Sequence, residues 1–212
     1  MLTQLTPDRL LITAILIAIF LLVAFPVHEF AHAAAAYLLG DATAKLYGRL
    51  TLNPIKHFDP LGGLLLVVSA LASGFLFGWA KPTPVNPANL RDKRNGEVLV
   101  AMAGPFSNVV MAFIGAFFFR LIRTLGIDAP FIELAAFLFV LFNVGLAIFN
   151  LIPVPPLDGS TILFRILPPQ TAWQLRPALQ QYGFVVLLLG IFVFARPLGT
   201  LISTIADALV GL

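Results

Sequence analysis

The chain of 212 residues contains no cysteine, and only 11% of its residues are charged. Soluble domains carry about 25% charged residues, so this shortage excludes an ordinary soluble protein, and a mean hydropathy of +0.97 indicates a membrane protein. The absence of cysteine excludes disulfides and leaves histidine and carboxylates as the ligands for any metal site. The net charge is only +3, and nothing in the chain indicates a nucleic-acid partner.

Long apolar stretches fill most of the sequence. Because a helix needs about 20 apolar residues to cross a bilayer, four stretches predict membrane helices, at about 9–39, 97–125, 131–152 and 182–210. The last contains Arg196-Pro197 and could be two pieces. The first is longer than the 7–15 apolar residues of a typical signal peptide, so cleavage is the weaker alternative.

These stretches predict an all-α polytopic membrane protein with four to six transmembrane helices and lipid around it. We expect one domain over 1–212, with a core at 9–165 and an extra C-terminal membrane helix at about 182–210. The glycine-rich run Leu61–Ala80 could cross the membrane or dip in and return.

A period of two appears between the first helix and that run. Leu46, Gly48 and Leu50 alternate with larger or polar residues, which favours a short membrane-associated β-hairpin. Such a strand could bind an extended peptide along its edge, which makes these three residues possible substrate-binding positions. A hairpin that merely lies at the interface is an equal alternative.

The stretch FPVHEFAHAA, residues 25–34, places three ionisable side chains at the end of an apolar helix. Residues four apart share a helix face, so His28 and His32 can hold one metal ion while Glu29 reaches a water bound to it. This H-E-x-x-H spacing is typical of zinc proteases. Charged groups within a membrane span are rare and usually functional, which disfavours a purely structural role.

A catalytic zinc ion needs a third protein ligand. Asp158 ends the stretch FNLIPVPPLDG, in which three prolines break a membrane helix. Unwound backbone at membrane depth occurs where it lines a cavity or is buried in protein, so Asp158 is the preferred ligand over a turn or capping role. His57, in a basic loop, is the weaker candidate.

Both ligand segments must lie on the same side of the membrane. Because the helix at 97–125 supplies one crossing between them, Leu61–Ala80 should be re-entrant or interfacial. That topology gathers 9 of the 13 basic residues on one side, which the positive-inside rule makes cytoplasmic: Lys45, Arg49, Lys56, Lys81, Arg91, Lys93, Arg94, Arg165 and Arg176.

Four motifs together, HEFAH, GWAKPTPVNP, AGPFSN and NLIPVPPLDG, resemble the site-2 protease family of intramembrane zinc metalloproteases, peptidase family M50. The resemblance covers about residues 20–165, in a minimal form without a PDZ or CBS domain. It implies one zinc ion on His28, His32 and Asp158, with Glu29 as catalytic base. It also implies that Asn150 contacts the substrate or its oxyanion, and that Asn108 is a motif asparagine and a candidate substrate-binding residue.

The resemblance further implies that transmembrane proteins are the substrates, in the inner membrane of a prokaryote, with the active site near the cytoplasmic side. Two other functions stay open at this point. A membrane metal-ion transporter would use the histidines and the acid but would not need Glu29 between them, and a non-catalytic protein that binds membrane helices would not need the ligands.

Overall fold

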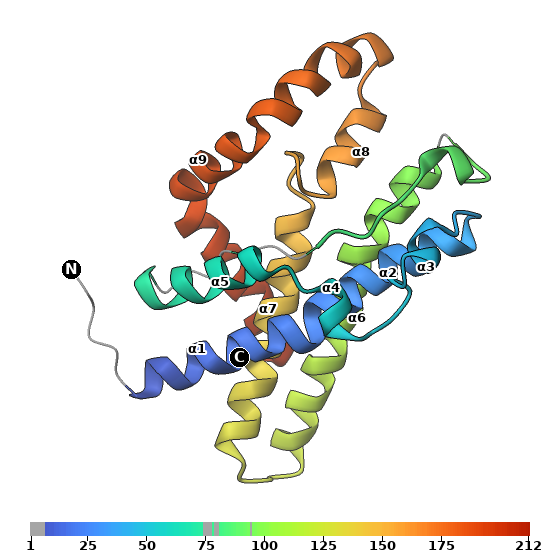
Figure 1. Ribbon diagram of the computed structural model, residues 1–212. Coiled ribbons are helices and arrows are strands. Elements are labelled where there is room, and N and C mark those ends of the chain that lie inside the picture. Colours follow the sequence, from blue (N-terminus) through green and yellow to red (C-terminus); the bar gives the residue numbers. More distant parts are fainter. Residues whose placement is uncertain (1–6, 74–77, 79–80, 94) are drawn as a thin grey trace.

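A computed structural model describes residues 7–73, 78, 81–93 and 95–212, and helices dominate this part of the chain (Figure 1). The longer helices are α1 (Pro7–Ile19), α2 (Phe25–Leu38), α5 (Pro60–Ser73), α6 (Gly96–Thr124), α7 (Pro130–Asn150), α8 (Gly159–Ile166) and α9 (Pro169–Val210). The shorter ones are the π-helix η1 (Phe20–Ala24), α3 (Thr43–Leu46), α4 (Pro54–His57) and the 3₁₀ turn η2 (Pro87–Asn89).

Four helical stretches of the described residues are long and apolar enough to cross a membrane, which confirms the four predicted spans. They are Leu10–Leu38, Gly96–Thr124, Pro130–Asn150 and Pro169–Val210. The first joins α1, η1 and α2 into one stretch.

Helix α9 begins well before the predicted start at about residue 182. Its 42 residues correspond to about 63 Å at 1.5 Å per residue, twice the hydrocarbon thickness of about 30 Å. The polar first turns of this helix therefore extend beyond the bilayer, and the hydropathy of the sequence predicted only the apolar part that follows them. Pro177 and Pro197 lie inside this helix without ending it, as membrane helices often allow.

The β-hairpin predicted around Leu46–Leu52 is wrong, because residues 43–52 contain the helical turn α3 and no strand. Asp41, one residue before the N-cap residue Ala42, accepts a hydrogen bond from the Thr43 amide at 3.0 Å. Gly48 follows the turn with a φ of +67°, a conformation that glycine adopts without strain. These local features at the two ends of the turn outweigh the alternating pattern.

The residues just before and just after the run that contains α5 lie next to each other. The Lys81 amide donates a 2.9 Å hydrogen bond to the His57 carbonyl, so the chain is in contact with itself before and after the run. The described part of this run in α5, Pro60–Ser73, has 14 residues, and 74–77 and 79–80 lie outside the described residues. The re-entrant or interfacial course of Leu61–Ala80 stays a prediction.

The packed centre of the molecule lies where α6, α7 and α9 meet. Ala112 and Ala116 of α6 face Val140 and Val144 of α7, and Ala206 of α9 completes the cluster. Small residues allow helix backbones to approach closely in a membrane, where packing rather than water exclusion holds helices together. Helix α6 also packs along α2, and this contact fixes the helix that carries the HEFAH motif.

Candidate metal centre

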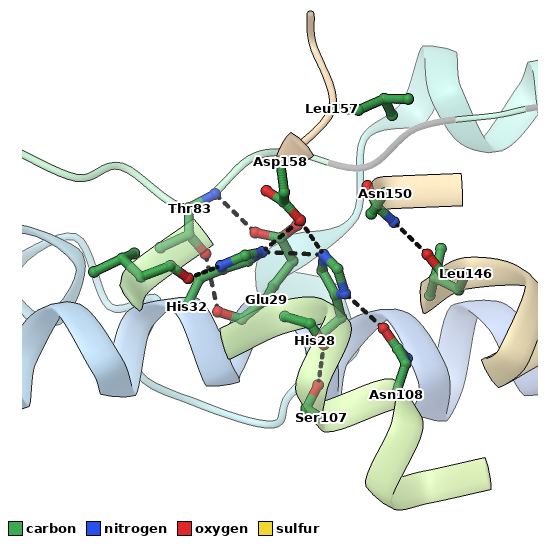
Figure 2. A network of polar contacts seen from close by, with 12 residues as sticks. His28, Glu29, His32, Thr83, Ser107, Asn108, Leu146, Asn150, Leu157 and Asp158 are labelled. Atoms are coloured by element: carbon green, nitrogen blue, oxygen red, sulfur yellow. Dashed lines mark hydrogen bonds and ion pairs between the residues drawn. The ribbon is translucent and has the colours of Figure 1, made fainter. Parts of the chain in front are cut away.

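Three predicted ligands from distant parts of the sequence meet at one point. His28 and His32 lie one turn apart on α2, and Asp158 lies directly before α8. The Nε2 atoms of the two histidines are 3.0 Å apart. Asp158 Oδ2 lies 3.3 Å from His28 Nε2 and 3.2 Å from His32 Nε2. Figure 2 shows the three side chains pointing toward one another, an arrangement able to hold a metal ion.

The sequence around each ligand explains this placement. Pro26 lies in the first turn of α2, where its missing N–H costs no helical hydrogen bond, so the helix continues through both histidines. The prolines after Asn150 end α7 and produce the irregular stretch 151–158, because proline cannot continue the helical hydrogen bonding. That stretch brings Asp158 back against α2.

Hydrogen bonds on the far side of each imidazole determine which nitrogen carries the proton. His32 Nδ1 donates to the Val100 carbonyl at 2.7 Å, and His28 Nδ1 donates to Asn108 Oδ1 at 2.6 Å. Both Nε2 atoms then present lone pairs to Asp158 Oδ2, a buried oxygen without a hydrogen bond. A positive charge between these three acceptors would relieve their mutual repulsion, and two imidazoles with one carboxylate are a ligand set that suits zinc.

Asp158 supplies the charge that such a cation needs. A carboxyl group binds a metal ion in its deprotonated form, so Asp158 would bring one negative charge beside two neutral imidazoles.

Gly104 of α6 forms the floor of the site. A Cβ atom at this residue would press on His32 Nε2 and lie 2.6 Å from Cε1 of both His28 and His32. Only glycine lets α6 pass this close to the imidazoles. The site is therefore a cradle shaped around the two rings, and any side chain on its floor would displace them.

Glu29 lies beside the ligands and is held by a loop far along the chain. Its Oε2 accepts a 2.8 Å hydrogen bond from the Thr83 amide, and its carbonyl accepts one from the Thr83 hydroxyl at 3.1 Å. The side chain is buried, yet it lines the same cavity as the ligands. Its position suits a general base, because it is fixed at one oxygen and lines the cavity beside the ligands.

A cavity of about 1200 Å³ opens over the site. Residues from all four candidate spans line it, including Leu16, Leu141, Phe149 and Leu198, together with Asn150 at the end of α7. Small-molecule pockets measure about 300–1,000 Å³, so this space exceeds what a small ligand needs. The Asn150 amide donates to the Leu146 carbonyl at 3.0 Å, and its second N–H is left for another acceptor.

The other predicted residues lie elsewhere. His57 is buried and bonds the Thr51 carbonyl at 2.8 Å through Nε2, outside the group of three ligands. Asn108 is fully buried beneath His28 and does not line the cavity. Leu46, Gly48 and Leu50 sit in and after the α3 turn and offer no strand edge.

Sequence reasoning missed four contributors to the site: Thr83, Val100, Gly104 and Asn143. Val100 contributes only its carbonyl, so no side-chain pattern could have identified it. Thr83 and Gly104 lie within the motifs GWAKPTPVNP and AGPFSN, which mark their segments but not their roles. Asn143 accepts a 2.9 Å hydrogen bond from the Asn108 amide, and its polar side chain within an apolar span was a usable signal.

Comparison with known proteins identifies relatives of this chain. The model of the family described as "Peptidase family M50" matches residues 123–193. A protein of Bacillus subtilis (strain 168) named "Putative zinc metalloprotease YwhC" is 43% identical over 193 residues, which cover 87% of this chain and 82% of the relative. No solved structure matches the chain.

Two mycobacterial proteins named "Putative zinc metalloprotease Rip2" are more distant. The protein of Mycolicibacterium smegmatis is 34% identical over 171 residues, 76% of this chain and 60% of its own length. That of Mycobacterium tuberculosis (strain ATCC 25618 / H37Rv) is 34% identical over 167 residues, 79% of this chain and 62% of its own length. The chain thus spans about three-fifths of these two relatives.

Proposed function

Because the chain belongs to peptidase family M50 and is a zinc metalloprotease, we propose that it hydrolyses peptide bonds within transmembrane segments of other proteins. The observation that carries this proposal is the position of the site. His28, Glu29, His32 and Asp158 all line a cavity whose walls come from the membrane-crossing helices. A substrate that reaches them must therefore enter between apolar helices rather than from bulk water.

In this proposal His28, His32 and Asp158 hold one zinc ion, the ion that the family uses. Zinc bound there would polarise the scissile carbonyl and lower the pKa of a bound water toward about 7. Glu29 takes the proton of the attacking water and passes it to the leaving amine. The Thr83 amide on Oε2 holds the carboxylate in place, so Oε1 is the oxygen available for the proton.

Asn150 stabilises the reacting carbonyl group in this proposal. It is the last residue of α7 and lines the cavity, and one of its two amide N–H groups is not used by the hydrogen bond to the Leu146 carbonyl. That N–H can donate to the oxygen that gains negative charge during attack, which lowers the barrier. Asn150 is thus a catalytic residue in the proposal, and the hydrophobic wall formed by α7 and α9 binds the apolar substrate segment.

In this proposal the chemistry takes place near the cytoplasmic face of a prokaryotic inner membrane. The hydrogen bond between the Lys81 amide and the His57 carbonyl supports a chain that returns to the same side between them, and with that topology the base count assigns the ligand side to the cytoplasm. All the catalytic groups come from residues 28–158, so a single domain with a helical extension, α9, suffices for the activity.

The test compares purified wild type with Glu29→Gln in lipid vesicles that contain tagged single-span membrane proteins. The substitution keeps the shape of the side chain and removes the base, so zinc content should stay equal while cleavage disappears. Glu133→Gln, on the first turn of α7 and outside the cavity, is the matched control and should cleave like wild type. Equal cleavage by wild type and Glu29→Gln would refute the role of Glu29.

A further inference from the structure

Two asparagines lie fully buried beneath His28, on helices α6 and α7. Asn108 and Asn143 both have 0% exposure, and each sits within a membrane-crossing segment. The Asn108 amide donates to Asn143 Oδ1 at 2.9 Å. An interhelical bond of this kind stabilises a membrane protein by only about 0.6 kcal/mol on average, so a stabilising role alone gives little reason to bury two amides here.

The direction of these hydrogen bonds can be deduced from a backbone carbonyl. The Phe139 carbonyl can only accept, and it lies 2.9 Å from the Asn143 amide nitrogen, so Asn143 must turn Oδ1 toward Asn108. Oδ1 can only accept, so Asn108 must turn its own NH₂ toward Asn143. Asn108 is then left with Oδ1 toward His28, at 2.6 Å from Nδ1.

The orientation of Asn108 determines which nitrogen of the metal ligand His28 carries the proton. With Oδ1 of Asn108 as its neighbour, His28 keeps its proton on Nδ1 and a lone pair on Nε2, the atom that faces His32 and Asp158. If Asn108 were reversed, its NH₂ would donate to Nδ1 and move the proton to Nε2. Neutral imidazole binds metal only through the nitrogen without a proton, so a reversed Asn108 would remove His28 as a ligand.

His32 provides an internal comparison. Its Nδ1 faces the Val100 carbonyl at 2.7 Å, and a backbone carbonyl cannot be reversed. Only His28 therefore depends on the orientation of a side-chain amide. The Ala24 carbonyl also lies 3.4 Å from the Asn108 amide nitrogen, but this longer contact is the weaker of the two restraints.

We propose that Asn143 is a positioning residue that sets the tautomer of His28 through Asn108, and so tunes the affinity of the metal site. The proposal rests on the proposed function, in which His28 binds zinc. It assigns to α7 a part in forming the site on α2, because Asn143 acts on the ligand through its hydrogen bond with Asn108. Outer residues that orient ligands typically change metal affinity 10–100-fold when removed.

The experiment measures the zinc dissociation constant of the full-length protein by competition with a chelator, and the tautomer of His28 by nitrogen NMR of the zinc-free protein. Asn143→Leu removes the acceptor and should weaken zinc binding 10–100-fold while the His28 signal shows a mixture of tautomers. Asn143→Asp, as the neutral acid that can still donate to the Phe139 carbonyl, accepts from Asn108 and should bind zinc within about threefold of wild type. Asn143→Met repeats the test if the leucine variant does not fold.

The double variant Asn108→Asp/Asn143→Leu separates positioning from packing. A carboxylate accepts through either oxygen, so it cannot be reversed, and it should restore tight zinc binding without Asn143. Zinc binding equal to wild type in Asn143→Leu and Asn143→Met, with His28 still protonated on Nδ1, would overturn the proposal. Failure of the wild type to bind zinc would instead refute the proposed metal site, and the NMR signal would still report on the tautomer.

Discussion

Replacing Gly104 by alanine should abolish zinc binding and leave the protein folded. The added Cβ would lie 2.6 Å from Cε1 of both His28 and His32, and an ordinary contact begins at 3.4 Å. The His28 ring must therefore retreat by about 0.8 Å, and the His32 ring by more, because its Nε2 lies closer still to the added atom. Zinc–nitrogen bonds of about 2.0–2.1 Å tolerate deviations of about 0.2 Å. We therefore expect zinc affinity to fall more than about 100-fold, which is more than the loss expected when a residue that only hydrogen-bonds to a ligand is removed.

The matched control is Gly190→Ala in α9, where an added Cβ meets nothing within 4 Å. Both substitutions replace a helical glycine by alanine, and this exchange by itself favours the helix by about 1 kcal/mol. Competition with a chelator gives the zinc affinity, and thermal unfolding of the zinc-free proteins in detergent shows whether each variant is folded. A folded Gly104→Ala variant that binds zinc as tightly as Gly190→Ala would refute the view that α6 forms the floor of the site.

Two further predictions concern the surroundings of the site. Burial by itself would raise the pKa of Asp41, but hydrogen bonds from Thr43, Asn89 and Asn86 lower the pKa below its ordinary value of 3.8. The ionised Asp41 therefore stabilises the fold above pH 3.8, and this stabilisation is lost as the pH falls through the pKa of the folded protein. Asp41→Asn replaces the oxygen that accepts from the Asn86 amide and should cost about 2 kcal/mol in chemical unfolding at neutral pH. The difference from wild type should narrow only below pH 3.8. Asn150→Ala should lower the rate constant of cleavage about 10²–10³-fold with unchanged zinc affinity; an unchanged rate would exclude an oxyanion contact.

The sequence predicts those features that depend on spacing and hydropathy. His28 and His32 share a helix face because they are four residues apart, and both lie on α2 as expected. The four spans follow from apolar length alone. The requirement that Asp158 and the histidines lie on one side predicts a re-entrant or interfacial course for Leu61–Ala80, and this stays a prediction.

Features that depend on contacts between distant residues could not be predicted in this way. The alternation at Leu46–Leu52 indicated a strand, but Asp41 and Gly48 stabilise a helical turn at its start. Thr83 reaches Glu29 from 54 residues away, and Asn143 reaches His28 only through Asn108. Such contacts require knowledge of how α2, α6 and α7 pack, which no local pattern contains.

X-ray absorption at the zinc edge of the purified protein tests the central claim most directly. The account predicts a first shell with two imidazole nitrogens and a carboxylate oxygen at about 2.0–2.2 Å, and the loss of that oxygen in Asp158→Ala. A zinc shell without imidazole, or a shell unchanged by removal of Asp158, would contradict it.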